Sequence, residues 1–236
     1  MVDISIVLPA YNEEEILERT VTALRTGLEN FPMTWQILIV ENGSTDATLN
    51  IATDLSTSLP EVSVCTLMEP DYGAALAEGF RRSHGRYVVN FDVDYYDLGF
   101  LDAAIKLSND HAASIVVASK RAEGSDDRRP LLRRILTACF TAVLVRGFKL
   151  PVSDAHGMKL LKRDELAALV DTCEMTQSLF DVELILRADR AGLLVLELPV
   201  KVDEQRRPRS SVLRRTFQVL KDLNRLRRAL QRAKAA

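Results

Sequence analysis

The stretch ISIVLPAYNEEE, residues 4–15, contains in order the three parts from which the first half of the chain is built. Residues 4–8 are mostly aliphatic and β-branched, which predicts a buried strand. Residues 9–13 are polar and follow the strand directly. Residues 13–28 predict a helix, and its acidic first turn suits the positive end of the helix dipole. A strand, a polar turn and a helix therefore succeed one another without a linker.

The same order of elements recurs as far as residue 119. Further strands are expected at residues 36–40, 62–67, 87–91 and 114–119. One helix is expected to begin at residues 44–46, and others to occupy residues 73–84 and 98–107. Continuous apolar strands separated by helices predict an α/β fold with a mainly parallel sheet covered on both faces. Ligands of such sheets bind beyond the carboxyl ends of the strands.

The chain beyond residue 119 has a different character. We expect a charged loop at residues 120–130, a helix at 131–145, a polar segment at 154–159, a helical stretch ending near residue 191 and a strand at 193–202. The last 36 residues carry 12 Lys or Arg against 3 Asp or Glu, a net +9 that leaves −11 for the rest. Residues 211–236 have apolar positions at helical spacing, which predicts a basic amphipathic helix.

The composition is that of an ordinary soluble domain. Of 236 residues, 47% are hydrophobic and 27% charged, enough for a full core. Cys65, Cys139 and Cys173 lie in apolar stretches without metal-site spacing, so we expect buried, reduced thiols in a cytosolic protein. No secretory signal is expected, and the longest apolar run, residues 135–145, is too short to span a bilayer. A net charge of −2 argues against a nucleic-acid binder.

Polar clusters follow three of the predicted strands, at residues 9–13, 41–44 and 92–94. On an extended chain, Asp92 and Asp94 point to the same side while Val93 turns away. Both carboxylates can then face one hard cation, Mg²⁺ or Mn²⁺. The alternative is a solvated cluster of turn-forming acids. Asp97 is either a further carboxylate behind this pair or the N-cap of the helix that begins at residue 98.

Three motifs occupy these strand ends: Pro9-Ala10-Tyr11-Asn12-Glu13, Glu41-Asn42-Gly43-Ser44-Thr45-Asp46 and Asp92-Val93-Asp94. They resemble the Pro-x-Tyr-Asn-Glu opening, the Asp-Asp-Gly-Ser-x-Asp turn and the Asp-x-Asp metal motif of family-two glycosyltransferases. The second half resembles the dolichyl- or polyprenyl-phosphate sugar synthase branch of that family. That likeness rests on Ser119-Lys120-Arg121, Arg133 with Thr137, Asp154 with Gly157 and Lys159, Glu197-Leu198-Pro199, and Arg206-Arg207 with Ser210-Ser211. The departures are Glu41-Asn42 in place of Asp-Asp, Asp71-Tyr72-Gly73 in place of Asn-x-Gly, and Tyr96 in place of a glutamine.

The resemblance implies a GT-A catalytic domain at residues 1–210, followed by the basic helix at 211–236. Residues 1–119 would bind the nucleotide sugar and residues 120–210 the acceptor. The implied reaction is inverting transfer of a hexose from a GDP- or UDP-sugar to a polyprenyl phosphate. Mg²⁺ or Mn²⁺ on Asp92 and Asp94 would neutralise the leaving diphosphate.

The resemblance also assigns roles to single residues. The implied nucleotide-sugar contacts are Pro9, Tyr11, Glu13, Glu41, Asn42, Asp92, Val93, Asp94 and Arg121. The implied acceptor-phosphate contacts are Arg133, Thr137, Arg206 and Arg207, the first two on one helical face. Asp154 joins Asp92 and Asp94 as a catalytic candidate. It would be the general base for a hydroxyl acceptor, whereas a phosphate acceptor is already an anion.

Two other interpretations remain open. One is a soluble transferase of the same fold with a hydroxyl acceptor. The other is a catalytically silent protein that binds nucleotide sugars or a membrane surface. The transferase interpretation predicts peripheral contact with the cytoplasmic membrane face through residues 131–145 and the basic helix. The alternative for both helices is ordinary packing on the domain.

Overall fold

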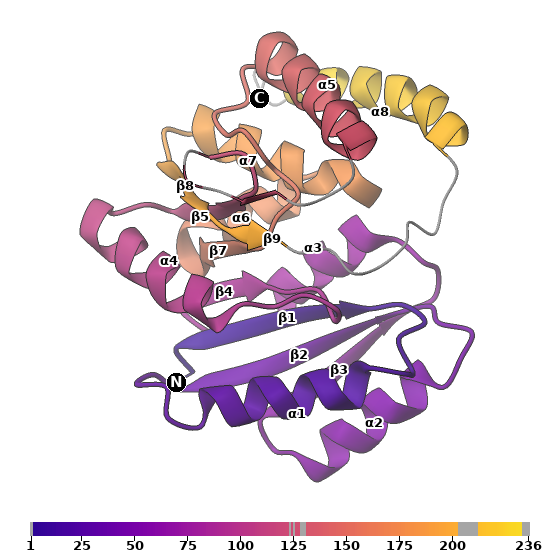
Figure 1. Ribbon diagram of the computed structural model, residues 1–236, viewed down its shortest axis with the longest axis vertical. Helices are drawn as coiled ribbons and strands as arrows, with labels where there is room; N and C mark the ends of the chain where they lie inside the picture. The colour runs from indigo at the N-terminus through magenta and orange to yellow at the C-terminus, as the bar shows by residue number, and fades with distance from the viewer. Residues whose placement is uncertain (1, 123, 125, 128–130, 203–211, 233–236) are drawn as a thin grey trace.

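The computed structural model describes residues 2–122, 124, 126, 127, 131–202 and 212–232. Their main feature is a seven-stranded sheet with the order β3-β2-β1-β4-β7-β5-β8 (Figure 1). The strands are β1 (Ile4–Ala10), β2 (Trp35–Asn42), β3 (Val62–Leu67), β4 (Tyr87–Asn90), β5 (Ile115–Ser119), β7 (Lys159–Lys162) and β8 (Val195–Pro199). Two short strands, β6 (Asp126–Asp127) and β9 (Lys201–Val202), pair separately.

Helices occupy both faces of the sheet, as the alternating pattern predicts. They are α1 (Leu17–Leu28), α2 (Thr48–Ser58), α3 (Tyr72–Arg82), α4 (Leu98–His111), α5 (Leu131–Phe148), α6 (Arg163–Thr172), α7 (Phe180–Arg190) and α8 (Val212–Arg232). A single 3-10 turn, η1 (Gln177–Leu179), precedes α7. One core cluster joins α1, α2 and α4 to the sheet, and the other joins α3, α6, α7 and α8 to its opposite face.

The strand β7 is the exception to the parallel pattern. It lies between β4 and β5 and runs antiparallel to both. The sequence predicts a helical stretch soon after residue 159 and misses this strand. Four residues, two of them lysines, are too few for hydrophobic periodicity to distinguish a strand from a helix start. Because β7 is reversed, its first residue, Lys159, pairs with the last residue of β4, Asn90.

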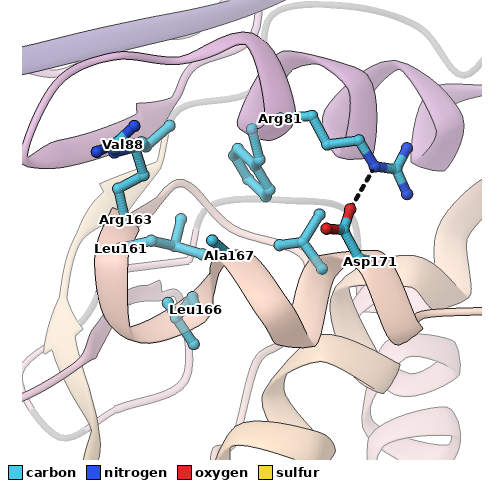
Figure 2. A pocket seen from close by; sticks show the side chains of 9 residues that line it. Arg81, Val88, Leu161, Arg163, Leu166, Ala167 and Asp171 are labelled. Atoms are coloured by element: carbon cyan, nitrogen blue, oxygen red, sulfur yellow. Dashed lines mark hydrogen bonds and ion pairs between the residues drawn. The ribbon is translucent and has the colours of Figure 1, made fainter.

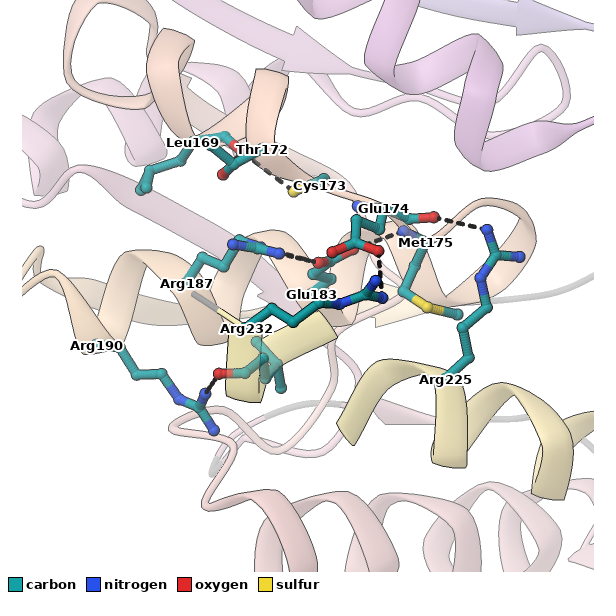
Figure 3. Close-up of polar contacts among 11 residues, drawn as sticks. Leu169, Thr172, Cys173, Glu174, Met175, Glu183, Arg187, Arg190, Arg225 and Arg232 are labelled. Carbon is teal, nitrogen blue, oxygen red and sulfur yellow. Dashed lines mark hydrogen bonds and ion pairs between the residues drawn. The ribbon is translucent and has the colours of Figure 1, made fainter. Parts of the chain in front are cut away.

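The helix α8 packs on α7 through part of its length. Leu226, Ala229 and Leu230 are buried there. Two contacts anchor it: Arg190 donates to the Leu230 carbonyl, and Arg232 pairs with Glu174 at 2.7 Å. Figure 3 shows Arg232 beside Glu174. Packing on the domain is therefore what the structure shows for residues 221–232. No helix in the described part of the chain has the length and apolar content needed to cross a membrane.

The three cysteines are free thiols in different environments. Cys65 is buried and Cys173 partly buried, and burial raises the pKa of both thiols. Cys139 is exposed, so the expectation of a buried thiol is wrong at this position. It lies on α5, whose exposed residues also include Val143 and Val145. An apolar neighbourhood in the sequence does not show which side of a helix faces the core.

Candidate active site

The Asp92-Val93-Asp94 motif lies in a narrow reverse turn just after β4. The backbone N–H of Asp92 donates to the Tyr95 carbonyl at 3.0 Å, and the N–H of Tyr95 donates back to Asp92 at 3.1 Å. Val93 is buried, and its carbonyl accepts a 2.7 Å hydrogen bond from the Thr20 hydroxyl. The expected extended geometry is therefore wrong, although Val93 does turn away from solvent. Val93, the middle residue of the motif, therefore anchors the turn to the core.

Tyr72 contacts the first carboxylate of this turn. Its hydroxyl donates to Asp92 Oδ1 at 2.9 Å from the first residue of α3. Burial raises the pKa of Asp92, the hydrogen bond from Tyr72 opposes that rise, and the charge of Asp94 adds to it. Burial and Asp92 together raise the pKa of Tyr72 well above its usual value, so the phenol stays a neutral donor. The sequence shows Tyr72 only as a departure from a family pattern.

Two features of this turn fit a divalent cation. Asp94 is exposed and close enough to Asp92 to raise its pKa, a repulsion that a bound cation would remove. Among the described residues, no group of three or more His, Cys, Asp or Glu side chains is arranged to hold a metal. Two carboxylates supplemented by phosphate oxygens and water are a usual arrangement for Mg²⁺ in nucleotide sites.

The loops after β1 and β2 are joined to each other near this turn. The Asn12 N–H donates to Ser44 Oγ at 3.0 Å, and Asn12 Oδ1 accepts from the Thr45 N–H at 2.8 Å. The Glu13 N–H donates to Thr48 Oγ1 at 2.8 Å. Asn12 adopts a left-handed backbone with φ of 52°, which this residue type tolerates better than most. These hydrogen bonds between the two loops hold the polar segment after Pro9 in place. Tyr11, in that segment, is exposed.

Glu41 and Asn42 are buried at the end of β2. Glu41 Oε1 accepts from the Ser44 N–H at 2.6 Å, which closes the turn. Asn42 Oδ1 accepts from the Asp71 N–H at 2.9 Å. Asp71 in turn caps α3 by accepting from the Ala74 N–H. The oxygen of Asn42 therefore links β2 to the helix that carries Tyr72.

Asp154 is buried in a loop that approaches the same edge of the sheet. Glu197 Oε1 accepts from the Ser153 and Asp154 N–H groups at 2.8 and 3.2 Å. Asp154 Oδ1 accepts from the His156 N–H at 3.1 Å. Arg121 is exposed just beyond β5. The structure thus brings Asp154 and Arg121 to the edge where β4 ends.

The other predicted acceptor contacts are described only in part. Arg133 and Thr137 lie one turn apart on α5, but their side chains are outside the described part. Arg206 and Arg207 lie wholly outside it.

A cavity of about 300 Å³ lies between α3 and α6, away from the predicted site residues (Figure 2). Phe80, Val88 and Leu161 form part of its lining, and an ion pair between Arg81 and Asp171 links the two helices beside it. None of the predicted site residues lines this cavity. The candidate site is therefore the polar edge of the sheet.

Comparison with known proteins gives relatives along most of the chain. Dolichyl-phosphate beta-glucosyltransferase ALG5A of Trichomonas vaginalis is 28% identical over 214 residues, which cover 85% of this chain and 66% of the relative. Glycosyltransferase AglD of Haloferax volcanii is 28% identical over 204 residues, covering 84% of this chain. This chain spans just under two thirds of the first relative's length and 33% of the second's.

The fold also matches solved structures. Glucosyl-3-phosphoglycerate synthase from Mycobacterium tuberculosis, in complex with Mn²⁺ and UDP-glucose, aligns with a TM-score of 0.69. The alignment has 20% sequence identity and covers 95% of this chain and 79% of that one. Such a likeness shows a shared GT-A-type architecture. The sequence pattern described as Glycosyl transferase family 2 matches residues 5–169. The chain therefore belongs to glycosyl transferase family 2.

Proposed function

We propose that this chain transfers a hexose from a nucleoside diphosphate sugar to a polyprenyl phosphate, with inversion at the sugar. The observation that carries the proposal is the turn of Asp92 and Asp94 at the carboxyl edge of the sheet, held by Thr20 and Tyr72. Relatives named dolichyl-phosphate beta-glucosyltransferases support the acceptor class and favour glucose as the sugar.

Asp92 and Asp94 would hold Mg²⁺ or Mn²⁺. When bound, the ion supplies neutralisation of the charge that develops on the leaving diphosphate. Tyr72 keeps Asp92 in one orientation through its 2.9 Å hydrogen bond. Thr20 keeps the Val93 backbone, and with it the direction of Asp94, fixed to α1. The chain thus presents both carboxylates in one arrangement before the donor arrives.

The joined loops after β1 and β2 would bind the nucleoside. Tyr11 is exposed for stacking on the base, and Glu13 would accept from the ribose hydroxyls. Asn42 and Glu41 would act on the base mainly by shaping the turn, since an oxygen of each bonds backbone N–H groups. Arg121 would contact the donor phosphates, which suits the forked geometry of a guanidinium.

A phosphate acceptor fits the environment of Asp154. The acceptor oxygen is already an anion near neutral pH, so the reaction requires no strong base. Asp154 is buried and bonded to the His156 N–H, which suits an orienting role. Arg133, Thr137, Arg206 and Arg207 are proposed to bind the acceptor phosphate. A hydroxyl acceptor would instead require Asp154 to reach the acceptor as a base.

We also propose peripheral contact with the cytoplasmic membrane face. The helix α5 exposes Val143 and Val145, and α8 exposes Arg227 and Arg228. Apolar and basic side chains are the two contributions that attract a helix to an anionic lipid surface.

The test uses the purified chain with UDP-glucose or GDP-mannose, a polyprenyl phosphate in lipid vesicles, and Mn²⁺ or Mg²⁺. The proposal predicts a lipid-linked sugar that forms only with a divalent metal and disappears with chelator. Asp94→Asn should abolish it, whereas Asp110→Asn, an exposed acid at the far end of α4, should not. Metal-dependent transfer to a hydroxyl acceptor but not to the lipid phosphate would refute the acceptor class. Absence of metal-dependent turnover with every nucleotide sugar would refute the enzyme.

A further inference from the structure

A buried ion pair lies directly behind the candidate site. Lys159 Nζ is 3.1 Å from Asp181 Oδ2, and the two side chains are 0% and 3% exposed. Lys159 begins β7, and Asp181 is in the first turn of α7. Removing two charges from water is costly, and well-packed apolar residues of similar size are often at least as stable. Stability alone therefore gives a poor reason for this pair.

Lys159 organises the loop that carries Asp154. Besides Asp181, its ammonium group donates to the Gly157 carbonyl at 2.6 Å and to the Ala155 carbonyl at 3.3 Å. These three acceptors match the three N–H groups of a lysine. At the other end of the loop, Glu197 binds the Asp154 N–H. The Glu197 carboxylate thus holds the start of the loop and the Lys159 ammonium group holds its end.

The same pair lies next to the Asp92–Asp94 turn. The Lys159 backbone N–H donates to Asn90 Oδ1 at 3.1 Å, and Asn90 precedes Asp92 by two residues. Burial dominates the raised pKa of Asp92, and the charge of Lys159 acts in the opposite direction. The charge of Asp181 likewise contributes to the raised pKa of Tyr72, after burial and Asp92. Lys159 and Asp181 are therefore electrostatic neighbours of the Tyr72–Asp92 contact.

We propose that Lys159 and Asp181 form a positioning pair that aligns the Asp154 loop with the Asp92–Asp94 turn. The inference rests on the proposed transferase function and names residues that the reaction depends on without contact to substrate. Lys159 is fully buried, so it acts through the carbonyls that it holds. Asp181 Oδ1 is buried without a hydrogen-bond partner among the described residues. The role of this carboxylate is therefore to neutralise the buried charge of Lys159 rather than to complete a hydrogen-bond network.

The informative variant removes both charges at once, as Lys159→Met with Asp181→Leu. Loss of Lys159 alone would leave Asp181 buried and unpaired, which strongly destabilises a fold. The double variant should fold with a melting temperature close to that of the unmodified protein. Donor hydrolysis by water, measured with UDP-glucose and Mn²⁺, should change less than threefold. Transfer to polyprenyl phosphate should fall at least tenfold, because misplacement by about 1 Å can cost about 100-fold.

The matched control is a second buried pair on the same helix. Arg187 and Glu183 interact at 2.6 Å, and Glu183 also accepts from the Glu174 and Met175 N–H groups (Figure 3). Glu183→Gln with Arg187→Met should lower the melting temperature while leaving the ratio of transfer to hydrolysis unchanged. That ratio separates positioning from a general loss of folded protein.

A second readout does not depend on turnover. Amide hydrogen exchange of residues 153–158 should accelerate at least tenfold in the Lys159→Met/Asp181→Leu variant, with β1 unchanged. Unmodified transfer and exchange in that variant would overturn the inference, and so would its failure to fold. If the unmodified protein turns over no nucleotide sugar, the proposed function fails, and loop exchange alone then decides whether the pair positions the loop.

Discussion

Gly73 is where a single methyl group should disturb the candidate site most directly. It follows Tyr72 in α3 and lies against the chain just before α7. A Cβ at this position would lie 2.4 Å from the Gln177 carbonyl oxygen, 2.7 Å from its nitrogen and 2.8 Å from Phe180 Cβ. Contacts of real Cβ atoms rarely fall below 3.0 Å. In Gly73→Ala, the start of α3 must therefore move away from Gln177 by about 0.6 Å or more.

The expected effect has two parts. Overpacking of this kind costs about 1–3 kcal/mol, or about 2–12 °C in melting temperature for a chain of this size. The same movement stretches the 2.9 Å hydrogen bond from Tyr72 to Asp92 beyond the ordinary range for two oxygens. A hydrogen bond to a charged group contributes about 1.5–3 kcal/mol, so metal-dependent turnover should fall about 10- to 100-fold.

The assay combines calorimetric melting with turnover of UDP-glucose at saturating Mn²⁺. The matched control is Gly147→Ala on α5, because a Cβ there has nothing within 4 Å. Alanine favours a helix over glycine by about 1 kcal/mol, so this variant should melt at the same or a slightly higher temperature. A Gly73→Ala protein with unchanged melting and unchanged turnover would show that the start of α3 does not position Tyr72.

Three further outcomes follow from the same contacts. Burial and a like charge raise the pKa of Asp92, so the folded state binds that proton more readily than the unfolded state. Metal-free protein should therefore gain stability as pH falls through the folded pKa toward the unfolded value of about 3.9. Asp92→Asn should remove that gain in thermal melts with chelator, and it should lower turnover about 10²–10³-fold. Thr20→Val leaves the Val93 carbonyl without its hydrogen bond, so the free energy of unfolding measured with denaturant should fall by about 1–3 kcal/mol. Titration calorimetry should also show a weaker affinity for Mn²⁺. Values equal to those of the unmodified protein would contradict the anchoring role. Gly157→Ala would place Cβ 2.1 Å from the Ala118 oxygen, so its melting temperature should fall by about 2–12 °C, and an unchanged value would disprove the close packing.

Local sequence patterns predict most of the parallel sheet because they depend on short-range chemistry. The runs at β1, β2 and β3 are apolar and bounded by polar turns, and the structure has strands there. The N-cap alternative for Asp97 is also confirmed, since its side chain accepts from the Phe100 N–H at 3.0 Å. Both features involve residues within a few positions of one another.

What the sequence misses depends on partners far along the chain. β7 is a strand because β4 and β5 flank it, and its own four residues carry little signal. Tyr72 becomes part of the candidate site only when the fold brings the start of α3 to Asp92, 20 residues later in the sequence. Asp181 pairs with Lys159 across 22 positions for the same reason. Local sequence patterns identify the chemical type of each of these side chains, but they do not show which residues come into contact in the fold.

The reversed strand β7 also has a consequence for how such a protein can diversify. The Ala118 N–H bonds the Met158 carbonyl at 2.8 Å, so the chain leaves β5 and returns to β7 at neighbouring points. Residues 119–157 therefore form an excursion whose two ends are joined by sheet hydrogen bonds. Evolution can lengthen, shorten or exchange such an insert without altering the register of the seven-stranded sheet. The proposed acceptor-side residues Arg133, Thr137 and Asp154 all lie in this insert, so exchanging it would replace the proposed acceptor site and leave the Asp92–Asp94 turn in place.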